Sequence, residues 1–251
     1  MQVFGMSDVG MKRSLNEDNF SVSLLDGGVI ALVCDGMGGA NAGEVASKVA
    51  CRQFIANIVP TIKQIKDTTE DKVERILKIE RAIYDQCNKS NAEVWQMSTK
   101  DEQLSGMGTT MSGCAIIDDV VITFNVGDSR VYHVSHTGAA QLTVDHSFVQ
   151  ALLDQGKITY DEAQNHPNRN VILRALGTQK EIECDISRTP LVEGYYLICS
   201  DGMSNYFDED VFINIINSKM PISEKVEQLV YFANSKGGSD NITVILIDTQ
   251  K

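Results

Sequence analysis

Four aspartates in this sequence lie where an apolar segment meets a glycine-rich turn. They are Asp35, Asp128, Asp201 and Asp240, within segments 33–39, 125–130, 199–202 and 237–242. Apolar strands fix such positions from behind, and neighbouring glycines let the backbone approach closely. Asp-Gly is also a common turn dipeptide, which would account for any one of them alone. Four in one chain favour a shared chemical role.

If these side chains meet, their charges need compensation. Two carboxylates about 4 Å apart repel by about 4 kcal/mol at an effective dielectric constant of roughly 20, so they either take up protons or bind cations. Ligands that are all oxygen suit Mg²⁺ or Mn²⁺ better than zinc. Two ions that share a carboxylate would lie about 3.5–4 Å apart and would make hydroxide near neutral pH.

The segment 13–19 adds complementary groups. Arg13 can hold a phosphate with its forked guanidinium, and Glu17 and Asp18 can hold water around a metal ion. An ordinary surface role would explain Arg13 taken alone. Beside the four aspartates, the segment supplies what a metal-dependent phosphate site requires.

The elements that must position these residues are mostly short strands. Apolar runs predict strands over 2–8, 20–25, 29–34, 110–117, 120–126, 130–135, 140–144, 182–187, 195–199 and 242–247. Helical spacing predicts helices over 42–58, 70–95, 148–153 and 223–234. Tight turns between consecutive strands indicate antiparallel hairpins. We therefore expect an α+β fold of two antiparallel sheets packed face to face, with helices on the outer faces.

Length and charge limit the classes of function. The 251 residues fit a single domain, 1–251, in which the least regular stretch, 147–180, is expected to be a mobile insert over the site. Acidic residues outnumber basic ones 34 to 22, for a net charge of −12, which argues against nucleic-acid binding. Apolar runs are far shorter than the roughly 20 residues that span a bilayer, and the first ten residues do not resemble a secretion signal. We expect a cytoplasmic monomer.

Cysteine and histidine chemistry is not indicated. The six cysteines form no C-x-x-C pair, and none has the arginine six positions later that a cysteine-dependent phosphatase would need. They are expected to be reduced core thiols. The four histidines are not paired at metal-ligand spacing, so surface or turn roles are expected for them.

Six short segments follow one another from Gly5 to Ile247, nearly the whole chain. They are Arg13-x-x-x-Glu17-Asp18, Asp35-Gly36-Met37-Gly38-Gly39, Gly108-Thr109-Thr110, Gly127-Asp128-Ser129-Arg130, Ser200-Asp201-Gly202 and Ser239-Asp240-Asn241-Ile242-Thr243. Their order and spacing resemble the successive motifs of the PP2C-type (PPM), metal-dependent protein serine/threonine phosphatases. Each motif is weak by itself, but six in the family's order are specific. The segment 166–177 resembles the flap of bacterial members in particular.

The resemblance implies a four-layer α-β-β-α sandwich with two Mn²⁺ or Mg²⁺ ions at one end. It implies hydrolysis of phosphoserine and phosphothreonine in proteins, the products of a serine/threonine kinase. A hydroxide that bridges the metals would attack phosphorus, without a phosphoenzyme intermediate. Local cations would let a phosphate enter an acidic protein.

The same resemblance assigns roles to single residues. Asp35 would bridge the two ions, the carbonyl of Gly36 would bind the second ion, and Asp201 and Asp240 would bind the first. Glu17 and Asp18 would reach the metals mainly through water, and Asp128 with Asp201 would hold a third, weaker ion. Arg13 would grip the substrate phosphate.

Two other interpretations compete with this one. The glycine-rich segment 36–41 follows a strand, as in dinucleotide-binding proteins, but Asn41 stands where that motif requires Gly or Ala. A catalytically silent phosphoprotein-binding module of the same fold is the stronger alternative. The complete set of mutually repelling aspartates argues against it, and Ala40 is its only support.

Ala40 departs from the family pattern. Bacterial relatives commonly carry a histidine there, which can contact substrate or help to protonate the leaving group, and Met37 occupies the place of the histidine in the animal enzymes. A missing general acid typically costs about 10²–10⁴-fold, and the loss is greatest for poor leaving groups such as alkoxides. A metal-bound water could substitute.

We therefore predict that Ala40→His raises turnover of a phosphothreonine peptide more than turnover of an aryl phosphate, because only the peptide releases a poor leaving group. Steady-state kinetics on both substrates measure the difference. Equal effects on the two substrates would remove this explanation.

Overall fold

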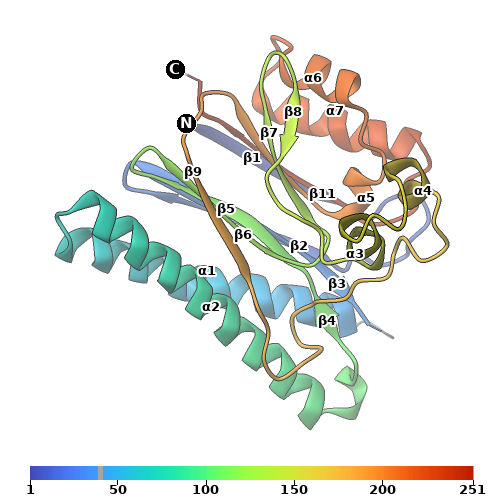
Figure 1. The fold of residues 1–251 in the computed structure, drawn as a ribbon, viewed down its shortest axis with the longest axis horizontal. Helices are drawn as coiled ribbons and strands as arrows, with labels where there is room; N and C mark the ends of the chain where they lie inside the picture. Colours follow the sequence, from blue (N-terminus) through green and yellow to red (C-terminus); the bar gives the residue numbers. More distant parts are fainter. Residues whose placement is uncertain (39–41, 251) are drawn as a thin grey trace.

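The computed structural model describes residues 1–38 and 42–250. Two antiparallel sheets pack face to face (Figure 1). The first sheet contains, in spatial order, β1 (Gln2–Asp8), β11 (Ile242–Asp248), β10 (Tyr195–Cys199), β7 (Arg130–Val134) and β8 (Ala139–Gln141). The second contains β2 (Asp18–Leu25), β3 (Gly28–Met37), β5 (Met111–Ile117), β6 (Val120–Val126) and β9 (Asp185–Pro190), with β4 (Gly108–Thr109) paired to β3.

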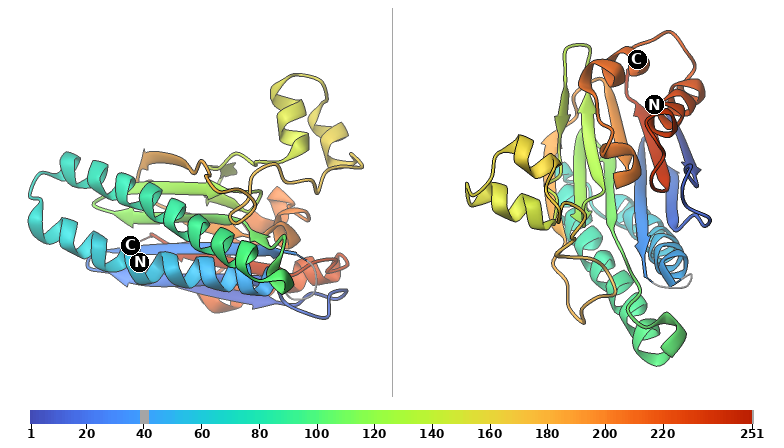
Figure 2. Two further views of the ribbon diagram at one scale, coloured as in Figure 1. Left: turned by 90° about the horizontal axis from the view of Figure 1, so that it is seen from below. Right: turned by 90° about the vertical axis from the view of Figure 1, so that its right-hand side faces the viewer.

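Helices cover the outer face of each sheet. They are α1 (Ala42–Thr68), α2 (Lys72–Lys100), α3 (Phe148–Asp154), α4 (Tyr160–Gln164), α5 (Asp201–Ser204), α6 (Glu209–Ile216) and α7 (Ile222–Ser235), with a 3₁₀ turn at Glu102–Leu104. The long pair α1 and α2 lies against the second sheet, and α6 and α7 lie against the first (Figure 1). Figure 2 shows α3 and α4 standing out from the sandwich, within the stretch 147–180. None of the helices in the described residues is long and apolar enough to cross a membrane.

Strand β3 shows why the layers form. Its residues 29–34 are fully buried, and successive side chains of a strand point to opposite faces. Val29, Ala31 and Val33 pack between the sheets, whereas Ile30 and Leu32 pack against the helices. A strand buried on both faces reads as a continuous apolar run rather than an alternation. The expected α+β fold of two antiparallel sheets flanked by helices is confirmed.

Several boundaries differ from the expected ones. Helix α1 continues past residue 58 to Thr68 through Pro60, because Phe54, Ile58 and Ile62 extend one buried stripe that outweighs the cost of the proline. Strand β9 covers 185–190 rather than 182–187, since its pairing with β6 runs from Asp185 to Pro190. The strand predicted over 140–144 is shorter, and β4, α4, α5 and α6 were not predicted. Ala40 lies outside the described residues.

Candidate functional site

Strand register brings the predicted site residues to one end of the sandwich. Asp18 begins β2 and pairs directly with Asp35 near the end of β3. In the other sheet, the end of β10 pairs with the start of β7 and lies beside the start of β11. Asp201 follows β10, Asp128 precedes β7 and Asp240 precedes β11. Because neighbouring strands are antiparallel, these strand ends bring all five aspartates to the same end of the sandwich.

Two glycines allow the backbones around these aspartates to approach closely. A Cβ atom on Gly36 would lie 2.2 Å from the carbonyl oxygen of Gly43, at the start of α1. A Cβ atom on Gly202 would lie 2.0 Å from the carbonyl oxygen of Asn241. Any larger residue would force these segments apart, so Gly36 and Gly202 keep Asp35, Asp201 and Asp240 together.

Burial and mutual repulsion make the carboxyl groups hard to ionise. Burial and the charges of Asp18 and Asp201 raise the pKa of Asp35 well above its ordinary value. Burial raises the pKa of Asp201 to about 6, with a further contribution from Asp240, although a hydrogen bond with Asp35 opposes the rise. Burial and the charge of Asp201 raise the pKa of Asp128 to about 8. Strongly shifted, mutually coupled carboxyl groups are typical of functional sites.

Asp18 has hydroxyl partners that sequence analysis did not assign to the site. The hydroxyls of Ser200 and Thr243 each donate to its Oδ2 at 2.7 Å. Burial raises the pKa of Asp18 to about 7, although these two hydrogen bonds act in the opposite direction. Both residues stand inside the quoted motifs, yet their partner is 182 and 225 positions away in the chain. A local sequence pattern carries no signal for such a contact.

Asn241 was also missed as a positioning residue. Its Oδ1 accepts from the backbone N–H of Glu17 at 2.8 Å, and its amide donates to the carbonyls of Val9 and Leu15 at 2.9 Å. It therefore ties the segment that carries Arg13 and Glu17 to the loop that carries Asp240.

Arg13 is bound to one of the predicted metal ligands. Its Nη2 donates to Asp240 Oδ2 at 2.8 Å, with half of the arginine side chain exposed. This hydrogen bond is the main reason why the pKa of Arg13 is raised. The pKa of Glu17 is also raised, chiefly by burial, although the charge of Arg13 opposes this.

The donor set fits oxygen-preferring divalent cations. Asp18, Asp128 and Asp201 each have a buried Oδ1 without a hydrogen-bond partner, and such atoms are costly unless a cation or proton satisfies them. In residues 1–38 and 42–250, no three His, Cys, Asp or Glu side chains form a group that could hold a metal ion as they stand. Asp240 accepts a hydrogen bond from Arg13, and Asp201 Oδ2 accepts one from the Asn205 amide at 3.3 Å. Metal binding would therefore require these side chains to turn toward a common point.

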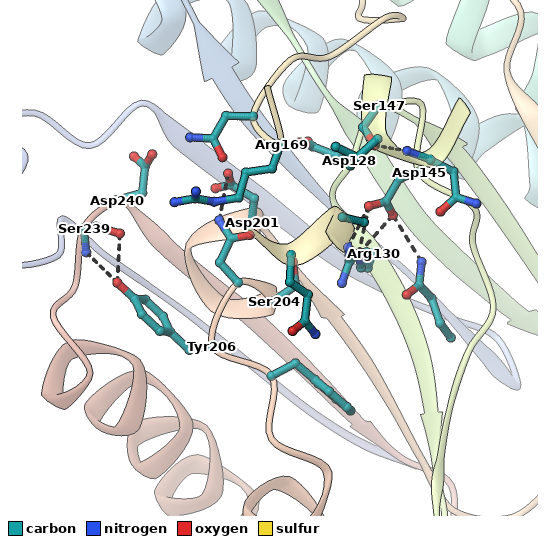
Figure 3. Close-up of a pocket in the computed structure, with 18 of the residues that line it drawn as sticks. Asp128, Arg130, Asp145, Ser147, Arg169, Asp201, Ser204, Tyr206, Ser239 and Asp240 are labelled. Carbon is teal, nitrogen blue, oxygen red and sulfur yellow. Dashed lines mark hydrogen bonds and ion pairs between the residues drawn. The ribbon is translucent and has the colours of Figure 1, made fainter. Parts of the chain in front are cut away.

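The site opens into a pocket of about 820 Å³. Figure 3 shows Asp201 at its centre, Asp240 on one side, and Asp128 on the other. Asp201, Asp240, Asp128 and Arg13 line the pocket, together with Arg169 from the stretch 147–180. Phe207, Phe232 and Lys236 also line it. The pocket is large enough for a phosphorylated side chain and flanking peptide.

Comparisons with known proteins agree with this geometry. A model of the family described as Protein phosphatase 2C matches residues 11–234. The chain is 38% identical over 250 residues to the serine/threonine phosphatase stp of Listeria monocytogenes, covering 98% of this chain and 96% of that protein. It is 36% identical over 250 residues to the protein phosphatase PhpP of Streptococcus pneumoniae, covering 98% and 97%.

Solved structures agree as well. The serine/threonine phosphatase Stp1 of Staphylococcus aureus superposes with a TM-score of 0.88 at 29% identity, over 100% of this chain and 95% of that one. The catalytic domain of the phosphatase PstP, solved in complex with two manganese ions, superposes with a TM-score of 0.80 at 29% identity, over 98% and 97%. The family and this neighbour suggest divalent metals. The chain described here belongs to the protein phosphatase 2C family.

Proposed function

We propose that this protein hydrolyses phosphoserine and phosphothreonine in proteins, with two divalent cations at the carboxylate cluster. When bound, the cations would supply a bridging hydroxide that attacks phosphorus, in line with the departing serine or threonine oxygen and without a phosphoenzyme intermediate. The observation that carries the proposal is the convergence of Asp35, Asp201 and Asp240 at one end of the sandwich, beside an open pocket.

We assign a role to each predicted ligand, which its side chain would take after turning toward a common point. Asp35, whose pKa is raised by burial and by the charges of the other aspartates, would bridge the ions, with the carbonyl of Gly36 as a further ligand. Asp201 and Asp240 would complete the ligand set of the first ion. The unpartnered oxygen of Asp128 would help Asp201 to hold a third, weaker ion. Mn²⁺ and Mg²⁺ both suit this set.

Glu17 and Asp18 would act mainly through water. One oxygen of Asp18 is already engaged by Ser200 and Thr243, which leaves Oδ1 free to accept from a water molecule. The Glu17 carboxylate accepts a hydrogen bond from the backbone of Gly43 at the start of α1. Held in this way, both groups would orient water without direct metal contact.

Arg13 would release the Asp240 carboxylate and bind the substrate phosphate in its place. In this structure its guanidinium neutralises Asp240. A cation bound to Asp240 would take over that neutralisation and release the guanidinium, which is half exposed, to hold the phosphate oxygens. The same charge would stabilise the transition state.

The leaving oxygen needs a proton donor, and none of the described residues that line the pocket is a histidine. Water held by the carboxylates would then supply the proton.

Substrates would be proteins phosphorylated by a serine/threonine kinase. The stretch 147–180 would act as a flap of the single catalytic domain 1–251. We propose that the protein acts in the cytoplasm as a monomer without nucleic-acid or membrane partners.

Asp35→Asn and Asp240→Asn should each lower kcat/KM by about 10²–10³-fold. Each substitution removes a negative charge that would hold the divalent cations, and those cations would stabilise the charge of the transition state. The assay is Mn²⁺-dependent hydrolysis of an aryl phosphate and of a phosphothreonine peptide. Asp119→Asn is a matched control, since the Asp119 side chain is 86% exposed in the β5–β6 turn and, among the described residues, its carboxylate pairs only with Lys72. Folded wild-type protein without turnover would instead favour the silent binding module.

Metal-free protein should lose stability as the pH rises. The pKa values of Asp201, Asp18 and Asp128 lie at about 6, 7 and 8 in the folded chain, whereas the unfolded chain releases these protons near the ordinary aspartate value of about 3.9. Folded protein therefore binds more protons than unfolded protein, and the associated stability disappears as the pH passes through the folded values. In EDTA, calorimetry should give a lower Tm at about pH 8.5 than at about pH 6.

Mg²⁺ should raise the Tm more at the higher pH, because the carboxyl groups have then lost their protons and are free to bind the cation. Asp128→Asn, which removes one of the raised carboxyl groups, should flatten the pH dependence in EDTA. A Tm in EDTA that increases over this interval would contradict the account.

A further inference from the structure

His146 makes a two-way contact with the turn that carries Asp128. The residue lies between β8 and α3, and its side chain is only 9% exposed. The backbone N–H of Gly127 donates to His146 Nδ1 at 3.1 Å. The backbone N–H of His146 donates in return to the carbonyl of Gly127 at 2.9 Å. His146 therefore bonds to both polar backbone groups of Gly127, and the amide of Asn125 also donates to the Gly127 carbonyl, at 3.2 Å.

The contact with Gly127 fixes the tautomer of the ring. A backbone N–H can only donate, so Nδ1 must be unprotonated and the proton of the neutral ring must lie on Nε2. Nε2 lies 3.1 Å from Asp185 Oδ2 and can donate to it. Arg174 Nη1 also lies 3.0 Å from Nε2, but it is itself a donor, and it bonds to Asp185 Oδ1 at 2.7 Å.

Asp185 is suited to accept a hydrogen bond from His146 Nε2, because its side chain is an ionised carboxylate. Burial alone would raise the pKa of Asp185, but the hydrogen bonds from His146 and Arg174 lower it below the ordinary value. The carboxylate thus orients the ring, as carboxylates orient the second nitrogen of histidines in many functional sites.

The turn itself has little freedom to adjust. Gly127 has φ of +111°, and a Cβ atom there would lie 2.6 Å from Thr110 Cγ2. Beyond Asp128, Arg130 is held by Asp145, the residue directly before His146, through bonds of 2.7–3.1 Å. Consecutive residues 145 and 146 therefore hold the two sides of the turn 127–130.

We propose that His146, oriented by Asp185, is a positioning residue that sets the place of the Asp128 carboxylate. It also connects that carboxylate to the segment 171–174, because Leu173 donates to the carbonyl of His146 at 2.7 Å and Arg174 bonds to Asp185. The inference rests on the proposed function only in taking Asp128 as a ligand of the weakest cation. Sequence analysis gave this histidine no role beyond a turn.

The other histidines lack this arrangement, and His133 Nε2 has no hydrogen-bond partner among the described residues. His166 Nδ1 accepts from Asn168, two residues along the same loop. His136 is exposed and lies 3.4 Å from Gln250. His136→Leu is therefore a suitable control for the loss of an imidazole.

Two variants of His146 separate positioning from general structural support. His146→Leu removes the acceptor for the Gly127 N–H. His146→Asn places an amide oxygen near the former Nδ1, where it can still accept from Gly127, but it cannot reach Asp185 as the ring does. Asp185→Ala leaves the ring in place without its orienting carboxylate.

The first measurement is amide hydrogen exchange by NMR on the full chain with Mg²⁺. His146→Leu should speed exchange of the Gly127 amide at least about tenfold, His146→Asn should stay within about threefold of wild type, and Asp185→Ala should fall between them. Amides of the central strands, such as Leu197 and Leu246, should be unchanged. Mn²⁺ titration followed by electron paramagnetic resonance should show the weakest site weakened about tenfold in His146→Leu and restored in His146→Asn.

The proposal is overturned if the folded Leu and Asn variants are equally impaired, or if His146→Leu leaves Gly127 exchange and the weakest Mn²⁺ site as in wild type. An unchanged Gly127 amide in Asp185→Ala would overturn the role given to Asp185. Aryl phosphate turnover by wild type and His136→Leu tests the proposed function separately. The two ideas can therefore fail independently.

Discussion

Mutual repulsion among buried carboxylates is the main physical constraint on the candidate site of this structure. Antiparallel register forces Asp18, Asp35 and Asp201 to one end of the sandwich, with Asp128 beside them. The rigid core behind these strand ends prevents them from separating. Protons and the Arg13 guanidinium can compensate part of the charge, but unpartnered buried oxygens remain. Divalent cations would compensate it more completely, so the raised pKa values of these carboxyl groups and the metal binding proposed for them would have one cause.

This constraint explains why the strands and the loops of the sandwich contribute differently to the site. Continuous apolar strands such as β3 are buried on both faces and hold the sandwich rigid, while each functional aspartate stands just beyond or at the end of a strand. Loops and short helices then contribute many of the residues that line the pocket. Helices α3 and α4, which stand out from the sandwich, can vary in sequence without disturbing the carboxylates. The segment 171–174 has less freedom, because Leu173 donates to the carbonyl of His146, which in turn contacts Gly127.

Sequence analysis identified the layers and the aspartates because both depend on local patterns. Apolar runs that end in Asp-Gly predict a buried strand followed by a tight turn. The buried strand is present before both Asp35 and Asp201, but Asp35 still lies within β3 and Asp201 begins helix α5. Sequence analysis could not find the supporting polar network. The partners of Asp18 are Ser200 and Thr243, and the contact of His146 with Gly127 also joins residues distant in the chain. Such contacts depend on register between strands, and short elements such as α5 depend on the turns that the site itself requires.

The Arg13–Asp240 pair is a further feature that no local pattern contains. It neutralises one carboxylate of the cluster with a side chain of the protein itself. The most direct test of the account is a crystal structure grown with Mn²⁺, with data collected at the manganese absorption edge. The account predicts two strong anomalous peaks about 3.5–4 Å apart, between Asp35, Asp201 and Asp240, with the guanidinium of Arg13 turned away from Asp240. An absence of peaks there, or peaks only elsewhere on the molecule, would contradict it.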